Sequence, residues 1–348
     1  EIQPVSWPCL LEMTQHPQPP QPAQSDGSAM RFDDTAVAFA HRSTRELRRA
    51  RWMFGLIGAP WLVKLGARAI DLALAVRLPI SWALRPVFDY FCGGESIADS
   101  LSTSDKLHAY GVQTILDFSA EGQTGEAALD AARDEILSTI KTAKDDPRFA
   151  FAVFKVSALS DNDLLQAKGE GLDFNANQQK AWEKVEGRVS FLCKSAEQQG
   201  VRIMMDAEET WLQDAIDGLA ESMMRQHNRG QCVVYTTAQM YRHDRLAYVQ
   251  ALEQSAREEG WVAGVKLVRG AYMEKERERA GAENKPSPIQ PDKAATDRDF
   301  NAALQYALDH LDHLNIVCGT HNERSTALLA DGMTQLGLDP GDPRVTFA

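Results

Sequence analysis

The 348-residue sequence has few of the features that mark zinc-binding or membrane-spanning proteins. Its cysteines are far apart and form no CxxC or Cys/His ligand spacing, which predicts a reducing compartment and no structural zinc. The five are Cys9, Cys92, Cys193, Cys232 and Cys318. The longest apolar region, residues 52–91, is interrupted by prolines and charged residues, so we expect no transmembrane helix.

Positive charge is also scarce. The formal net charge of -12 argues against general nucleic-acid binding, because neutralising phosphates requires a basic surface. The glycine-rich patterns GxGxxG and GxxxxGK[ST] are missing, so neither a Rossmann nor a P-loop nucleotide site is indicated. The basic residues gather in residues 41–91, which hold nine Lys/Arg against three Asp/Glu.

The composition divides the chain into three regions. Residues 1–32 are rich in Pro, Gln and Ser, which predicts a disordered leader. Residues 33–110 predict a helical arm, with helical patterns over 35–51 and 60–76. Residues 111–348 predict the main domain. The arginines of the arm lie near aromatic residues, which favours contact with anionic lipid, or alternatively packing against the main domain. These aromatic residues are Trp52, Phe54, Trp61 and Trp82.

After residue 110, short apolar segments alternate with amphipathic helices, which is typical of parallel βα units. The expected strands are Gln113–Phe118, Phe151–Val156, Val201–Asp206, Cys232–Thr236, Val265–Arg269, Asn315–Thr320 and Val345–Ala348. Apolar residues at helical spacing predict buried helix faces over 182–196 and 300–314. The pattern predicts a (β/α)8 TIM-type barrel, with an open doubly wound sheet as the alternative. Because no eighth unit follows, we expect a barrel that is C-terminally incomplete or closed by another element.

Polar residues gather at the ends of six expected strands. They are Asp117, Glu121, Lys155, Asp206, Glu208, Tyr235, Gln239, Lys266, Arg269, Thr320, His321 and Asn322. Each alone is also explained by an ordinary core or rim role, but together they predict a site for a small zwitterion or a phosphate-bearing cofactor. Lys155, within an apolar strand, also fits a Schiff-base aldolase, since desolvation lowers the pKa of an amine. His321 has no recognisable companion ligands, so we expect no metal.

The segment 265–272, VKLVRGAY, places Lys266 and Arg269 directly before Gly270. Glycine permits close approach of a ligand to the backbone and the cations suit an anion, which predicts a ligand contact; the alternative is a buried strand with a salt bridge and a turn. The connection 270–294 is long for a βα unit. It predicts an active-site lid, with a solvated helical turn and a proline-rich surface excursion as the alternative.

Four motifs, in order along the chain, resemble those of the proline dehydrogenase family. They are FKVSAL at 154–159, MDAEET at 205–210, KLVRGAYMEKER at 266–277 and GTHN at 319–322, and two further segments, FCGGES at 91–96 and LDFSAEG at 116–122, are similar to the monofunctional forms. The resemblance implies a distorted (β/α)8 barrel that binds FAD and oxidises L-proline to Δ1-pyrroline-5-carboxylate. It implies that the electrons pass on to a membrane quinone. In a bacterium the protein would then be cytoplasmic and bound peripherally to the inner membrane, and in a eukaryote it would be at the mitochondrial inner membrane or in the matrix.

The resemblance also implies roles for particular residues. Lys155 would pair with the carboxylate of proline, Asp206 would help to position that lysine, and Tyr272 would pack against the substrate ring. Glu121 would pair with an arginine as a gate. The implied flavin contacts are Gln239, Lys266, Val268, Arg269, Gly270, Thr296, Asp297, Thr320, His321 and Asn322, with Lys266 near the N5 edge of the flavin.

One part of the family pattern has no match. The eighth unit of the family carries a tyrosine and a YxxRRxxEN helix, whose arginines hold the substrate carboxylate. From this we expect weakened proline affinity. Two alternatives therefore stay open: an inactive truncated barrel with only a binding role, and the aldolase that uses Lys155.

Overall fold

The computed structural model describes residues 32–58, 96–117 and 125–348, together with scattered residues between 61 and 94. The expected leader up to residue 31, Trp82 and Glu121 lie outside the described residues. The chain divides into two compact units, residues 1–112 and 113–348.

The described helices of the first unit are α1 (Thr35–Ala38), α2 (Thr44–Ile57) and α5 (Ile97–His108). A capping box starts α2: the Ser43 hydroxyl accepts a bond from the Glu46 amide at 3.2 Å, and the Glu46 carboxylate accepts one from the Ser43 amide at 2.7 Å. The pattern over 35–51 is thus two helices, and most of 60–76 lies outside the described residues. Among the described helices, none combines the length and the hydropathy that crossing a bilayer requires.

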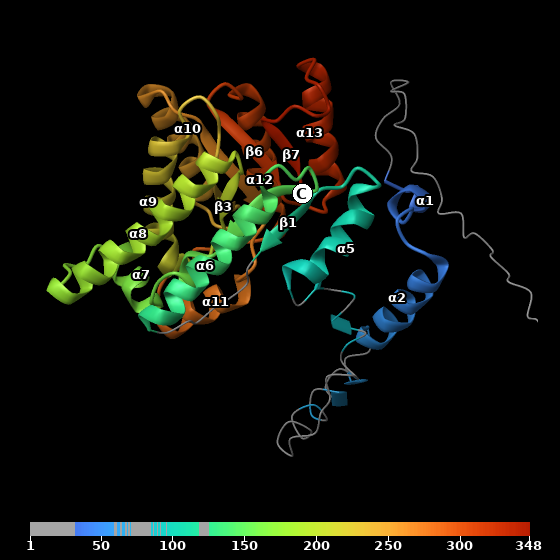
Figure 1. The fold of residues 1–348 in the computed structure, drawn as a ribbon, viewed down its shortest axis with the longest axis horizontal. Helices are drawn as coiled ribbons and strands as arrows, with labels where there is room; N and C mark the ends of the chain where they lie inside the picture. Colours follow the sequence, from blue (N-terminus) through green and yellow to red (C-terminus); the bar gives the residue numbers. More distant parts are fainter. Residues whose placement is uncertain are drawn as a thin grey trace, which may run out of the picture. The chain divides into compact units, whose positions relative to one another are not determined.

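The second unit is built on one parallel sheet of seven strands, hydrogen-bonded in sequence order. They are β1 (Thr114–Asp117), β2 (Phe149–Phe154), β3 (Ile203–Met205), β4 (Val234–Gln239), β5 (Ala263–Val268), β6 (Leu314–Cys318) and β7 (Val345–Phe347). The sheet curls into a half-barrel (Figure 1). A doubly wound sheet would reverse its strand order, so this order confirms the TIM-type α/β fold.

Helices cover the outer side of the curled sheet (Figure 1). They are α6 (Glu126–Ala143), α7 (Asn162–Gly169), α8 (Ala176–Gln199), α9 (Thr210–His227), α10 (Arg245–Glu259), α12 (Lys293–Asp309) and α13 (Glu323–Gln335). The short 3-10 helix η1 (Val156–Ala158) follows β2, and α11 (Met273–Ala282) lies in the connection after β5. The face predicted over 182–196 is confirmed, since Trp182, Val189 and Ala196 of α8 are all buried.

Several strand ends differ from the predicted ones. β2 ends at Phe154, because the chain then turns into η1, so Lys155 follows the strand instead of lying within it. Asp206 and Arg269 likewise come just after β3 and β5, and β4 begins two residues later than expected, at Val234. The end of a ladder depends on where the neighbouring strand stops offering backbone partners, which the composition of one segment does not determine.

Two longer segments also differ. The buried face expected over 300–314 is too long, because α12 ends at Asp309 and Leu314 is the first residue of β6. The connection 270–294 contains α11 and an antiparallel bridge between Arg242 and Ile289. It is therefore an ordered excursion with a helix of its own, which agrees with the alternative of a helical turn and a surface excursion; the lid stays a prediction.

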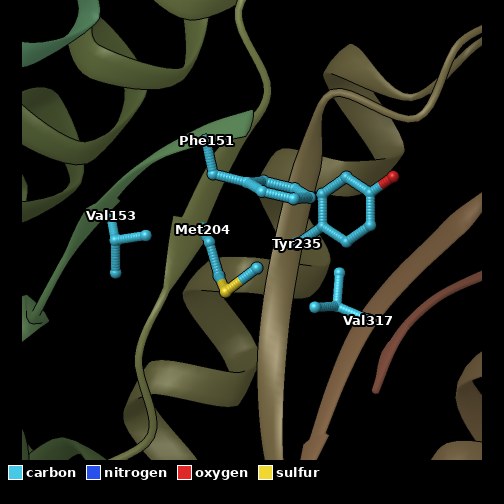
Figure 2. Packing of buried hydrophobic residues seen from close by; sticks show 5 residues of the cluster. All are labelled: Phe151, Val153, Met204, Tyr235 and Val317. Carbon is cyan, nitrogen blue, oxygen red and sulfur yellow. The ribbon is translucent and has the colours of Figure 1, made fainter. Parts of the chain in front are cut away.

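An apolar cluster fills the inner side of the sheet (Figure 2). Phe151 and Val153 lie two residues apart on β2 and point to the same side. They pack against Met204, Tyr235 and Val317 from three other strands, and all five side chains are at most 2% exposed. The rings of Phe151 and Tyr235 lie edge to face, with centroids 5.1 Å apart. Since side chains two residues apart share one face of a strand, the same face continues toward the carboxyl ends of the strands.

Replacing Phe151 with alanine is expected to lower the free energy of unfolding by about 3–5 kcal/mol, because it removes a fully buried ring and leaves a cavity. The matched control is Phe191→Ala on α8, whose side chain is 46% exposed and whose loss should cost about 0.5 kcal/mol. Chemical denaturation measures both. Equal losses would contradict the packing of Phe151 described above.

Candidate active site

A cavity of about 740 Å³ opens at the carboxyl ends of the strands, within the size range of cofactor and substrate sites. Its walls are formed by Asp117, Lys155, Asp206, Ala207, Thr237, Gln239, Lys266, Val268, Arg269, Gly270, Ala271, Tyr272, Lys293, Gly319, Thr320, His321 and Asn322. Four lysines and arginines against two aspartates leave a formal charge of +2 on the walls. This excess suits a ligand that carries negative charge.

Strand register explains why these residues meet. On β4, Tyr235 of the apolar cluster is followed on the same face by Thr237 and Gln239. The parallel pairing of β4 with β5 sets Thr237 opposite Lys266 and Gln239 opposite Val268. The inner face thus changes from apolar to polar as each strand reaches its carboxyl end, and the polar side chains converge there.

Lys155 and Tyr272 meet at one wall of the cavity. Lys155 comes directly after β2, and Tyr272 directly before α11. The Nζ atom of Lys155 donates a hydrogen bond to the Tyr272 hydroxyl at 3.4 Å. Burial raises the pKa of Tyr272, although the nearby ammonium of Lys155 acts in the opposite direction. Tyr272 is therefore a neutral phenol at neutral pH, next to a cation.

Asp206 and Lys266 form an ion pair at a second wall. The Oδ1 atom of Asp206 accepts hydrogen bonds from Lys266 Nζ and, at 3.3 Å, from the Thr237 hydroxyl. Their side chains are only 23% and 16% exposed, so the pair is largely shielded from water. This shielding fixes the lysine at one place in the cavity.

Arg269 ties three elements together. Its guanidinium donates to Asp297 at 2.7 Å, to the Thr320 hydroxyl at 2.5 Å and to the Ser325 hydroxyl at 3.1 Å. It also lies over the ring of Phe300, 4.4 Å from the centroid. These partners come from α12, the segment after β6, and α13, so the planar fork of one arginine aligns their starts beside the cavity.

The turn after β5 is shaped by Gln239 and Gly270. The Gln239 side chain accepts a hydrogen bond from the Ala271 amide at 2.9 Å and donates one to the carbonyl of Glu208 at 2.8 Å. Gly270 has a φ of 135°, and a Cβ atom there would lie 2.5 Å from the ring of Tyr241. Only glycine fits this turn, and it lies in the wall of the cavity.

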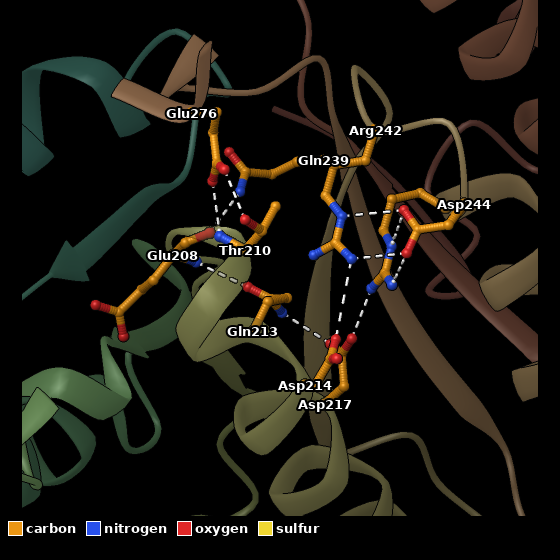
Figure 3. Close-up of polar contacts among 10 residues, drawn as sticks. Glu208, Thr210, Gln213, Asp214, Asp217, Gln239, Arg242, Asp244 and Glu276 are labelled. Carbon is orange, nitrogen blue, oxygen red and sulfur yellow. Dashed lines mark hydrogen bonds and ion pairs between the residues drawn. The ribbon is translucent and has the colours of Figure 1, made fainter. Parts of the chain in front are cut away.

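A polar network leads outward from the site (Figure 3). The Glu208 amide donates to the side chain of Gln213 at 2.9 Å, and Gln213 in turn donates to Asp217 at 2.7 Å. Arg245 donates to Asp217 at 2.6 Å. The first link joins α9 to the segment after β3, the second lies within α9, and the third joins α9 to the start of α10, so the network holds the segment after β3 in place.

The cavity brings together eleven of the fourteen residues to which the resemblance gives a role, and Asp297 contacts one of them, Arg269. The eleven are Lys155, Asp206, Tyr272, Gln239, Lys266, Val268, Arg269, Gly270, Thr320, His321 and Asn322. Thr296 does not line it but is buried on α12, where its hydroxyl donates to the Asp292 carbonyl at 3.3 Å. Glu121 lies outside the described residues. Tyr235, expected at a strand end, belongs to the apolar cluster instead, because β4 continues to Gln239.

Some wall residues were missed by sequence reasoning. Thr237 follows Tyr235 by two residues and would have been found from the alternation, had β4 been extended to Gln239. Lys293 starts α12 after a long connection, and no local pattern indicates that its side chain returns to the site. Within the residues that the structure describes, no three His, Cys, Asp or Glu side chains lie close enough to hold a metal ion.

A curled parallel sheet with strands in sequence order places the protein in the α/β-barrel class, whose active sites lie at the carboxyl ends of the strands, where this cationic cavity opens. The family can be stated from the sequence match: residues 100–348 match the profile of the family described as proline dehydrogenase, and the chain belongs to that family.

Known relatives agree with this assignment. The chain is 35% identical to the carbapenem antibiotics biosynthesis protein CarD of Pectobacterium carotovorum subsp. carotovorum, over 69% of this chain and 62% of CarD. It is 39% identical to proline dehydrogenase 1, mitochondrial, of Homo sapiens, over 46% of this chain and 27% of the human protein. The chain therefore spans less than two thirds of the length of either relative.

A solved structure shares the fold. The crystal structure of proline utilization A from Bdellovibrio bacteriovorus, inactivated by N-propargylglycine, superposes with a TM-score of 0.66 at 18% identity. The match covers 77% of this chain and 29% of that protein.

Replacing Gly270 with alanine is expected to destabilise the protein, because the new methyl group would collide with Tyr241 and the backbone would keep an unfavourable φ. The matched control is Gly230→Ala, at a φ of 102° with no heavy atom within 4 Å of the new Cβ atom. Gly270→Ala should lose about 1–3 kcal/mol more than the control in chemical denaturation. A smaller loss than in the control would contradict the close approach of Tyr241.

The buried carboxyl of Glu208 predicts a pH dependence. Burial raises the pKa of Glu208, although its hydrogen bond with Ser157 opposes the shift. An acid whose pKa is raised by folding stabilises the fold only below its unfolded pKa, and this contribution is lost as the pH rises through the folded value. The wild type should therefore lose stability relative to Glu208→Gln as the pH rises above the ordinary range of a glutamate carboxyl. Thermal unfolding of both proteins measures this; a wild type that gains stability relative to Glu208→Gln as the pH rises would contradict it.

Proposed function

We propose that this chain oxidises L-proline to Δ1-pyrroline-5-carboxylate with FAD as the electron acceptor. The observation that carries the proposal is the meeting of Lys155, Asp206, Lys266, Arg269 and Tyr272 around one cavity in a member of the proline dehydrogenase family. Lys155 and Tyr272 would form the substrate end of the cavity. The remaining walls would bind the cofactor.

The walls suit a flavin dinucleotide. A pyrophosphate needs cations and backbone donors, and the cavity offers Arg269, Lys293 and the segment that leads into α13. Gly270 adds main-chain atoms to the wall next to Arg269. The residues that would hold FAD are Gln239, Lys266, Val268, Arg269, Gly270, Thr320, His321 and Asn322. Asp297 would act through Arg269, and Thr296 is the weakest candidate because it does not line the cavity.

When bound, FAD supplies an acceptor for the hydride of the substrate carbon. Lys266 would lie at the N5 edge of the ring, held there by Asp206. Lys155 would bind the carboxylate of proline through its ammonium, and the Tyr272 ring would pack on the five-membered ring.

The substrate amine must be neutral before hydride leaves the adjacent carbon. Tyr272 is a neutral phenol at neutral pH and is not a base, and the Asp206 carboxylate is already engaged with Lys266 and Thr237. We therefore propose that the proton is lost to water as proline binds. Glu121 remains a proposed gate residue.

The electrons would pass to a quinone at a membrane, which requires contact with lipid. The helical arm supports this contact, since α2 carries several arginines and its Trp52 is 68% exposed. We propose peripheral binding to the cytoplasmic side of a bacterial inner membrane, or to the mitochondrial inner membrane in a eukaryote. The absorption and kinetic measurements described next, made with proline and with hydroxyproline, decide which of the two is the preferred substrate.

The absorption spectrum of the purified chain with FAD tests the proposal. We expect a protein-bound flavin spectrum that L-proline bleaches in the absence of oxygen. Lys155→Met should bind FAD but raise the KM for proline about 100-fold, because it removes a shielded partner of the carboxylate. The matched control, Lys180→Met on the exposed side of α8, should behave as wild type.

Other outcomes would favour the alternatives. A colourless protein in which borohydride and a carbonyl compound label Lys155 would favour the aldolase. A protein that neither binds flavin nor is labelled would favour a barrel with only a binding role.

A further inference from the structure

Helix α11, directly after Tyr272, is attached to the start of α9 by contacts that the proposed reaction does not use. The carboxylate of Glu276 accepts a hydrogen bond from the Thr210 amide at 2.7 Å and another from the Thr210 hydroxyl at 2.6 Å (Figure 3). Glu276 is only 2% exposed, although it lies in a helix that is otherwise polar. A buried carboxylate with two aligned donors is a specific contact, because either donor alone would leave charge unsatisfied.

The contact supplies a cap that α9 lacks. The first amides of a helix have no partner within the helix, and the N-cap residue of α9, Glu209, makes no side-chain hydrogen bond to them. Glu276 provides the missing acceptor from another helix, and its negative charge lies at the positive end of the α9 dipole. The same two hydrogen bonds thus cap α9 and hold the side chain of Glu276 in place.

Two neighbouring contacts reinforce the same attachment. Lys275 forms an ion pair with Glu209, and the guanidinium of Arg279 lies over the ring of Trp211 at 4.1 Å. Since α9 follows β3 and α11 follows β5, these contacts join two strand ends across β4, which lies between them.

The attachment reaches the cavity through one helical turn. The Glu276 amide donates to the carbonyl of Tyr272 at 2.9 Å, so a backbone hydrogen bond joins the two residues directly. On the other side, Thr210 lies four residues after Asp206. We propose that Glu276 is a positioning residue, which holds Tyr272 against Lys155 by anchoring α11 to the start of α9. The proposal rests on the proposed function for its effect on substrate, but not for its effect on α11.

Hydrogen exchange and steady-state kinetics of the FAD-loaded full chain test this together. Glu276→Ala should speed amide exchange in α11 at least about tenfold while the amides of β4 and β5 keep their rates, because two hydrogen bonds to a charged group are lost. Its KM for proline should rise about tenfold, with kcat and the Kd for FAD within about twofold of wild type. Glu276→Gln should restore most of the KM, since its amide oxygen can accept from the Thr210 amide and its NH2 group can donate to the hydroxyl.

The matched control is Glu274→Ala, an exposed glutamate in the first turn of the same helix, which should change neither readout. Thr210→Val removes one of the two bonds and keeps the backbone donor, so it should raise the KM about threefold and speed α11 exchange. This variant decides the question if Glu276→Ala does not fold.

Distinct results would overturn the proposal. Wild-type exchange and KM in Glu276→Ala, or in Thr210→Val, would show that the attachment does not position Tyr272. A fall in kcat and in FAD affinity that matches the rise in KM would make Glu276 a merely structural residue. If the wild type does not oxidise proline, the proposed function fails, but unchanged α11 exchange is still required to reject the anchoring.

Discussion

The site depends on one constraint, the alternation of side chains along parallel strands that all run in the same direction. The face that packs Phe151 and Tyr235 in the apolar cluster is the same face that presents Lys155 four positions after Phe151 and Thr237 two positions after Tyr235. Because all seven parallel strands end at the same edge of the curled sheet, the polar residues at their ends lie close together. The apolar cluster thus forms a rigid floor beneath the cavity.

Ion pairs reduce the cost in free energy of bringing these charged groups together. A cation that is shielded from water is costly unless it is paired, and here Asp206 pairs with Lys266 while Asp297 pairs with Arg269. The wall residues together keep an excess of positive charge. A lysine in place of Arg269 would retain the charge but could not reach Asp297, Thr320 and Ser325 at once.

The sequence alone identified the seven strands and their parallel order, because short apolar segments separated by amphipathic helices have few other arrangements. It was less accurate at the ends of elements. Placing the end of β4 too early hid Thr237, since the alternation was not followed beyond Thr236. Helix α11 was expected only as a helical turn, and only as an alternative, for a different reason: it buries only Glu276, so it has no apolar period, and its position depends on tertiary contacts with α9.

Motif resemblance and physical reasoning contributed different parts of the candidate site. Charges at strand ends predicted where a ligand would bind, but the assignment of single residues to substrate or flavin came from the resemblance. The structure adds which groups are paired with each other, such as Lys266 with Asp206. Pairing of this kind depends on rotamers and distances between strands, which no spacing within one segment determines.

The contact between Lys155 and Tyr272 joins residues 117 positions apart in the chain. Contacts of such long range form slowly, because most of the chain must be ordered before the two ends of the loop meet. The cavity walls, drawn from all but the last strand segment, are therefore completed late in folding. A ligand that binds only the finished cavity would shift the equilibrium toward the folded chain, so the supply of cofactor during synthesis would help to set how much of the protein reaches its native state.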